Sequence, residues 1–263
     1  MINQFRIILF FLFATLCANA QVLDSLEKKL EETLADSTRV RTLIALANEY
    51  QYSDIEKSIR LAEEAAQLAE LKKLDILLAK ANNAIGTFYS IKGNNIAATN
   101  YKMLALSVSL RIKDSLEMSL SYNNMGTDYL ALGKLDEAYF YFTQSYRIAD
   151  ATSDSLQMSI SLHNIGTVFK ELGQYDRATN YLQLSKKIST IIEDYEGIPY
   201  YFDEMGDIYL RKSQYDSALV SLNESLRLIR NQKMKINELE PVVLSKIAKT
   251  YLHKEEYENA NKS

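Results

Sequence analysis

The residue types best suited to catalysis are scarce in this sequence and do not form catalytic or metal-binding patterns. His163 and His253 are the two histidines, and neither belongs to an HxxxH or HExxH motif. Cys17 is the single cysteine and lies within the first twenty residues. No glycine-rich phosphate loop is present, and no Gly-x-Ser-x-Gly turn surrounds a serine. We therefore predict that the protein is not an enzyme and binds no metal or cofactor.

A repeat of forty residues organises most of the chain. Glycines recur at this interval at Gly86, Gly126, Gly166 and Gly206. The residues around them are also similar, as in 122–129 (YNNMGTDY) and 162–169 (LHNIGTVF). A fixed period of this size indicates a stack of one supersecondary unit. Such a stack offers a long surface rather than a closed pocket, so the repeat favours binding over catalysis.

Each repeat is predicted to hold two antiparallel helices. Apolar residues flank the glycine at helical spacing, such as Ile165 and Phe169 beside Gly166. An alanine follows twelve residues after each glycine, at Ala98, Ala138, Ala178 and Ala218. Turn residues lie between the two apolar stripes at Lys92-Gly93-Asn94, Gly133-Lys134, Gly173-Gln174 and Ser213-Gln214. We expect the small residues to let the helices approach closely and the aromatic residues to wedge between neighbouring units.

Capping signals agree with this arrangement. Asp114 and Asp154 stand forty residues apart, each followed three residues later by Glu117 or Gln157. An acceptor side chain followed by Glu or Gln at this distance is typical of a capping box, which opens a helix. Pro199 lies at a predicted first helical position, where the missing N–H costs nothing.

These offsets resemble those of the tetratricopeptide repeat. Residues 133–138 (GKLDEA) and 173–178 (GQYDRA) carry the resemblance, which covers roughly residues 40–263. The period of forty rather than about thirty-four is similar to the longer variety found in kinesin light chains and many bacterial signalling proteins. The resemblance implies an all-α fold, a right-handed α-solenoid of stacked antiparallel helix pairs.

The resemblance also implies where a partner would bind, because the first helices of such repeats line a concave groove. The candidate peptide-groove residues are Asn83, Thr87, Asn123, Asn124, Thr127, His163, Asn164, Thr167, Asp203 and Asp207. Their amides and hydroxyls could hydrogen-bond to an extended peptide backbone. Alternatively, the Asn and Thr side chains bridge neighbouring helices and touch no ligand.

The predicted groove changes in charge along its length. It is neutral and rich in amides near Asn83 and turns acidic at Asp203, Glu204 and Asp207. Arg211 adds one positive charge at this acidic end. A basic or neutral peptide suits the acidic end. The net charge of −4 over the whole chain argues against a nucleic-acid partner, which requires a clustered basic face.

The first twenty residues are typical of a secretory signal peptide. Arg6 precedes an apolar run from Ile7 to Cys17, and Ala18-Asn19-Ala20 supplies the small residues that a signal peptidase requires. We expect cleavage after Ala20 and a periplasmic or otherwise extracytoplasmic location. Lipidation at Cys17 is the alternative. The protein would then meet a membrane if lipidated, or if a longer natural chain carries a transmembrane helix.

The repeat register divides the chain into predicted segments. They are 1–20 signal peptide, 21–35 N-terminal capping helix, 36–75 divergent first unit, 76–114, 115–154, 155–194 and 195–236 complete units, and 237–263 incomplete last unit. A dimerisation helix is the alternative interpretation of 21–35. The incomplete last unit suggests either a fragment of a longer protein or an uncapped end that forms a homodimer.

We therefore predict an exported scaffold that binds a protein or peptide partner in its concave groove. Arrays of this kind resemble the sensor portions of bacterial signalling proteins, so the chain is expected to be such a portion. The alternative is a fragment of a membrane-bound sensor enzyme, a histidine kinase or nucleotide cyclase, or of a transcriptional regulator whose output domain is absent.

Overall fold

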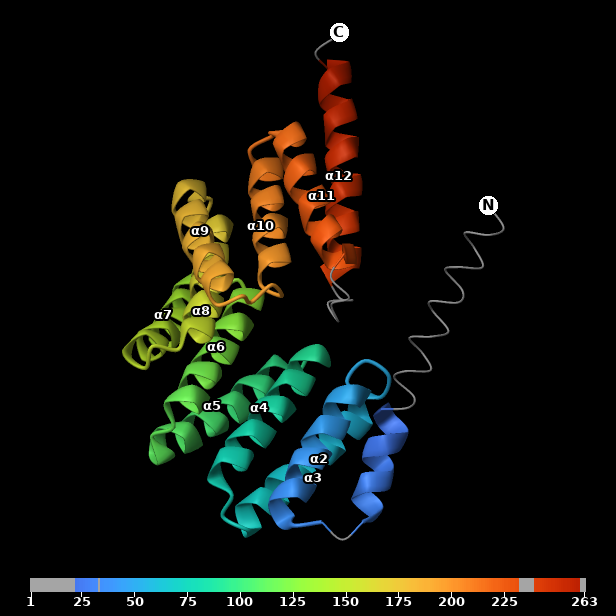
Figure 1. Cartoon of the computed structure of the whole chain (residues 1–263), viewed down its shortest axis with the longest axis vertical. Coiled ribbons are helices and arrows are strands. Elements are labelled where there is room, and N and C mark those ends of the chain that lie inside the picture. Colours follow the sequence, from blue (N-terminus) through green and yellow to red (C-terminus); the bar gives the residue numbers. More distant parts are fainter. Residues whose placement is uncertain (1–21, 33, 232–238, 261–263) are drawn as a thin grey trace, which may run out of the picture. The chain divides into compact units, whose positions relative to one another are not determined.

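The computed structural model describes residues 22–32, 34–231 and 239–260, and this part of the chain is helical without any β-strand (Figure 1). Consecutive helices pack in pairs, most extensively α4 with α5 and α8 with α9. The predicted all-α architecture of stacked helix pairs is confirmed. Within the described residues, no helix combines the length and apolar character needed to cross a membrane. The predicted signal peptide, residues 1–20, lies outside the described residues.

The chain divides into two units, Met1–Asp128 and Tyr129–Ser263, and each is described by itself. The helices of the first unit are the helix of residues 22–31, α2 (Asp36–Tyr50), α3 (Ile55–Leu71), α4 (Asp75–Ile91), α5 (Asn95–Ile112) and most of α6 (Ser115–Ala131). Those of the second unit are the end of α6, α7 (Leu135–Ala151), α8 (Ser155–Glu171), α9 (Tyr175–Ile191), α10 (Ile198–Arg211), α11 (Tyr215–Asn231) and α12 (Leu239–Ala260).

The turns inside the helix pairs lie at the predicted turn residues. Gly93, Gly133 and Gly173 have φ angles of 81°, 69° and 73°, in the left-handed region that glycine adopts without a Cβ clash. Ser213 holds the same place in the α10–α11 turn with φ 58°, at a steric cost that glycine would avoid.

The predicted capping residues open their helices. Asp114 Oδ1 accepts a hydrogen bond from Glu117 N at 2.9 Å, and Asp154 Oδ1 accepts one from Gln157 N at 3.0 Å. Each aspartate satisfies a backbone N–H that the helix itself leaves without a partner.

The recurring glycines are places of close helix approach. A Cβ built on Gly166 would lie 2.8 Å from Leu182 Cγ, and one built on Gly206 would lie 2.5 Å from Leu222 Cγ. Both leucines are fully buried. The second helix of each pair therefore packs directly against the backbone of the first, as the glycine period predicted.

The aromatic residues of the repeat pack mainly against each other within one helix pair. The rings of Tyr129 and Tyr141 stack with centroids 5.1 Å apart, and those of Phe169 and Tyr181 stack at 5.3 Å. Tyr139 meets Phe169 edge-on at 5.5 Å and so links α7 to the next pair. The expectation that these residues wedge between units holds for Tyr139, whereas the stacked rings join the two helices of one pair.

One charged pair interrupts the apolar core of the first unit. Lys102 on α5 is buried and Asp128 on α6 is half-buried, and Lys102 Nζ lies 2.6 Å from Asp128 Oδ1. At forty-residue intervals from Lys102 stand buried apolar residues, namely Phe142, Leu182 and Leu222. The positions equivalent to Asp128 are also apolar and buried, namely Phe88, Val168 and Ile208. Two core residues have thus been replaced together by an ion pair.

The helix of residues 22–31 packs against α2 and α3. Glu27 Oε1 accepts hydrogen bonds from Tyr50 Oη at 2.7 Å and Lys57 Nζ at 2.9 Å. Leu30 lies against the apolar core formed with Val40 and Leu43.

Candidate functional site

The candidate residues of the first unit bond mainly to their own fold. Asn83 on α4 is buried, and its Nδ2 donates a hydrogen bond to Ser121 Oγ on α6 at 3.1 Å. Thr87 Oγ1 donates to the Asn83 carbonyl oxygen at 3.0 Å. Asn83 therefore bridges two first helices, as the alternative interpretation of these amides proposed.

The other candidates of this unit lie on α6. Asn123 and Asn124 are half-buried, and Thr127 is exposed. Thr127 Oγ1 donates to the Asn123 carbonyl oxygen at 3.1 Å. Asn123 and Thr127 are separated by one helical turn, so they share one face of α6.

In the second unit, His163, Asn164 and Thr167 are half-buried on α8. Thr167 Oγ1 donates to the His163 carbonyl oxygen at 3.2 Å. The same bond to the carbonyl four residues earlier is made by Thr87 and Thr127. A hydroxyl has one proton, so in this state these threonines can accept a hydrogen bond from a ligand but not donate one.

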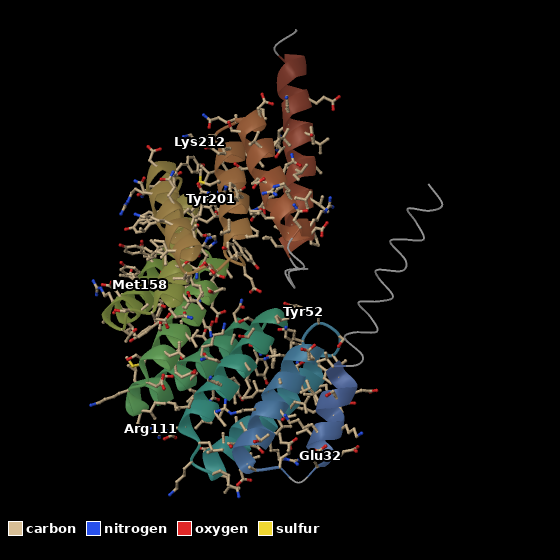
Figure 2. All side chains as sticks on the ribbon, in the orientation of Figure 1. Glu32, Tyr52, Arg111, Met158, Tyr201 and Lys212 are labelled. Carbon is tan, nitrogen blue, oxygen red and sulfur yellow. The ribbon has the colours of Figure 1, made fainter. Side chains whose placement is uncertain are left out.

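His163 and Asn164 line a hollow of about 460 Å³, here called the α8–α10 pocket. Its wall is completed by Leu156 and Ile160 from α8, by Tyr200 from α10, and by the segment that joins α9 to α10. Met158 and Tyr201, labelled in Figure 2, mark the first turns of α8 and α10. The rings of His163 and Tyr200 meet edge-on with centroids 6.3 Å apart.

The charged side chains that line the α8–α10 pocket are all acidic. Asp194 and Glu196, from the segment between α9 and α10, line it, and no lysine or arginine does. Burial lowers the pKa of His163, and the positive charges of Lys170 and Lys246 act in the same direction against Glu204. The imidazole is therefore neutral at pH 7, and the pocket carries only negative charge.

Asp203 and Asp207 lie on α10 and are held by ion pairs within the fold. Lys246 Nζ on α12 lies 2.7 Å from Asp203 Oδ2. Burial raises the pKa of Asp203 despite this lysine. Burial acts to raise the pKa of Asp207 too, but Lys170 and other cations lower it overall.

Lys170 is the centre of this charge cluster. Its side chain is buried, and its Nζ lies 2.8 Å from Glu204 Oε2, 2.8 Å from Asp207 Oδ2 and 3.2 Å from Glu171 Oε1. Burial acts to lower the pKa of Lys170, but the carboxylates raise it above its usual value. The acidic end that the sequence predicted is thus largely compensated inside the protein.

Sequence reasoning did not single out several residues of this site. Lys170 stands three residues after Thr167 and Tyr200 three residues before Asp203, so their places beside candidate residues could have been inferred from helical spacing. Asp194 could have been found from the register, because it stands forty residues after Asp154, whereas Glu196 stands where Leu116 and Leu156 occur and departs from the pattern. In the residues that the structure describes, no group of three or more His, Cys, Asp or Glu side chains could hold a metal ion.

Comparisons with known proteins support the repeat. The family profile described as tetratricopeptide repeat matches residues 117–191. None of the curated proteins compared with this sequence matches it.

Solved structures share the fold at low identity. BtubC from P. vanneervenii has a TM-score of 0.62 and 16% identity, covering 80% of this chain and 88% of its own. A Rap protein complexed with Competence and Sporulation Factor has a TM-score of 0.65 and 16% identity, covering 87% and 69%. The STAND protein PH0952 from Pyrococcus horikoshii, which has a tetratricopeptide repeat sensor, has a TM-score of 0.63 and 17% identity, covering 86% and 35%.

Proposed function

We propose that this chain, a tetratricopeptide repeat protein, binds an extended segment of a partner protein on the first-helix face of its second unit. Stacked helix pairs present their side chains as a continuous surface, which suits them to hold other proteins. The Rap structure, complexed with Competence and Sporulation Factor, is a neighbour of the same fold. Its likeness supports a binding role for the fold and leaves the partner of this chain to experiment.

The observation that carries the proposal is the α8–α10 pocket. Two residues chosen from the groove pattern, His163 and Asn164, line it together with the exposed apolar side chains of Leu156 and Tyr200. Ligand sites are hollows of about 300–1,000 Å³, largely apolar with a few polar groups. The pocket meets that description on the face where a partner is expected. The first-unit residues Asn83 and Thr87 instead have their donors bonded within the fold.

The test is a selection of random 12-residue peptides, displayed on phage, against the purified protein. Peptides that bind are synthesised with a fluorophore, and their dissociation constants are measured by fluorescence anisotropy. We expect His163→Ala combined with Asn164→Ala to weaken binding at least about tenfold, or about 1.4 kcal/mol. Val220→Ala is the matched control, because it removes an exposed apolar side chain from α11 on the opposite helix layer.

Two results would overturn the proposal. One is a set of selected peptides whose affinity does not change in the double variant. The other is an equal loss in the double variant and in Val220→Ala, which would place the binding surface elsewhere. Circular dichroism of each variant distinguishes lost binding from lost folding.

We further propose that the protein is exported and serves as the sensor portion of a signalling system. Residues 6–20 support export by their signal-peptide pattern. The sensor role is supported by the likeness to PH0952, in which a tetratricopeptide repeat array is named as the sensor. N-terminal sequencing of the protein from its native host should begin at Gln21, and an intact Met1 would refute cleavage. The natural reading frame past Ser263 should encode a membrane helix or an output domain, and a stop codon there would refute the sensor-portion proposal.

A further inference from the structure

We propose that the α8–α10 pocket selects peptide segments in which a large apolar side chain stands next to a lysine or arginine. The inference rests on the proposed function, because it names the chemistry of the partner at the same site.

The apolar part of the pocket is open to solvent. Leu156 is 44% exposed and Tyr200 is 40% exposed, and Ile160 between them in the pocket is half-buried. Exposed apolar groups gathered in a hollow favour an apolar occupant, since covering them removes their surface from water. A single large side chain is the size of occupant that three such residues can surround.

The rim supplies two carboxylates without a lining cation. Asp194 is half-buried and Glu196 is exposed, and both come from the segment that joins α9 to α10. The lysine of α8, Lys170, is engaged by Glu204, Asp207 and Glu171. The rim is therefore complementary to a cation brought by the partner.

The remaining polar groups of the pocket have partners within the fold. Ser159 Oγ lies 2.6 Å from Ser189 Oγ, and Ser185 Oγ donates to the Ser159 carbonyl oxygen at 2.8 Å. These serines therefore need no hydrogen bond from a ligand. Apart from these serines, His163, Asn164 and the Tyr200 hydroxyl, the side chains that line the pocket are apolar or anionic, so an apolar residue beside a cationic one is the complementary pair.

The experiment uses four versions of the tightest peptide obtained from the display selection. The first keeps its apolar–cationic pair, the second replaces Lys or Arg by Gln, the third replaces it by Glu, and the fourth replaces the apolar residue by Ala. Anisotropy titrations at about 50 mM and about 500 mM salt separate charge from packing, because salt screens exposed charges. We expect the Gln version to bind about tenfold more weakly at low salt and by less than about threefold at high salt.

A variant of the rim tests which carboxylates are responsible. Asp194→Asn combined with Glu196→Gln should abolish the difference between the Lys and Gln peptides but keep the loss caused by Ala. Asp136→Asn combined with Glu137→Gln is the matched control, because it makes the same charge change on exposed residues of α7. This control should retain the full preference for the cation.

The outcomes separate this inference from the proposed function. Peptides that depend on His163 and Asn164 but show no preference for a cation overturn the inference and leave the proposed function standing. A cation preference that survives in the rim variant also overturns it. Selected peptides that ignore His163 and Asn164 overturn the proposed function, and the inference falls with it.

Discussion

Replacing Lys102 by methionine should destabilise the first unit strongly, and adding Asp128→Val to the same chain should restore its stability. Methionine keeps an unbranched stem where Lys102 packs over Gly86, whose built Cβ would lie 2.6 Å from Lys102 Cγ. It removes the ammonium group that lies 2.6 Å from Asp128 Oδ1. The carboxylate then keeps the Ser90 hydroxyl, at 3.0 Å, as its remaining hydrogen-bond donor among the described residues.

The magnitude follows from the burial of both partners. The side chains of Lys102 and Asp128 are 4% and 13% exposed. Removing one partner of a buried ion pair costs about 3–5 kcal/mol, whereas replacing both by apolar side chains is neutral or stabilises by up to about 4 kcal/mol. Burial also lowers the pKa of Lys102, with Asp128 opposing the shift, so the ammonium depends on this carboxylate to stay charged.

The apolar alternative has precedents in the chain itself. At the same sequence separation, the positions of Lys102 and Asp128 are filled by Leu182 on α9 and Ile208 on α10. Both are buried in one hydrophobic core cluster. The double variant thus places apolar side chains in the first unit at two positions that are apolar and buried in the second.

Urea unfolding followed by circular dichroism measures the effect, and hydrogen exchange locates it. The Lys102→Met chain should lose about 3–5 kcal/mol with protection reduced in α4 to α6. Arg111→Met is the control, because it breaks the 2.8 Å pair with Asp75 on the surface, where Arg111 is 62% exposed. Surface pairs contribute about 1 kcal/mol at most. A single variant as stable as the control, or a double variant no more stable than the single, would refute the reasoning.

Three further predictions concern the second unit. Gly206→Ala should lower stability by about 1–3 kcal/mol in thermal unfolding, because its Cβ would meet Leu222 Cγ at 2.5 Å; an increase would mean that the leucine yields. Lys170→Met should cost about 3–5 kcal/mol in urea because Asp207 and its neighbours lose their buried cation, and a loss below about 1 kcal/mol would contradict that. Burial lowers the pKa of His163, so its contribution to stability is present above about pH 6.5 and is lost as the pH falls. His163→Gln should therefore lose less stability than the native protein when the pH falls from about 7.5 to about 5. Equal losses in the two proteins would contradict this prediction.

Much of the fold was accessible from the sequence because its signals are local. A glycine at position 166 and an alanine at position 178 report that two helices touch, and the structure places Leu182 against that glycine. Turn glycines such as Gly133 report a left-handed backbone directly, since other residues rarely adopt it. These signals recur at one period, so each repeat checks the interpretation of the others.

The candidate site was harder to predict, because it depends on which side chains meet across helices. The register placed Asp203 and Asp207 on one face but could not show that Lys246 and Lys170 neutralise them. Such pairing depends on side-chain geometry between α8, α10 and α12. For the same reason the sequence left open whether Asn83 contacts a ligand or bridges helices, and its bond to Ser121 is such a bridge.

Residues that depart from the repeat pattern can indicate a binding site, whereas the repeated positions indicate only the fold. Lys102 and Asp128 depart from the apolar core, but they compensate each other at 2.6 Å, so their departure serves the fold. Glu196 departs from the repeat at the position of Leu116 and Leu156, and together with Asp194 it lines an apolar pocket that contains no lysine or arginine. A charge that the fold leaves uncompensated beside exposed apolar surface is one that a partner can complement. For this reason the segment between α9 and α10, rather than the regular helix faces, is where partner specificity should be sought.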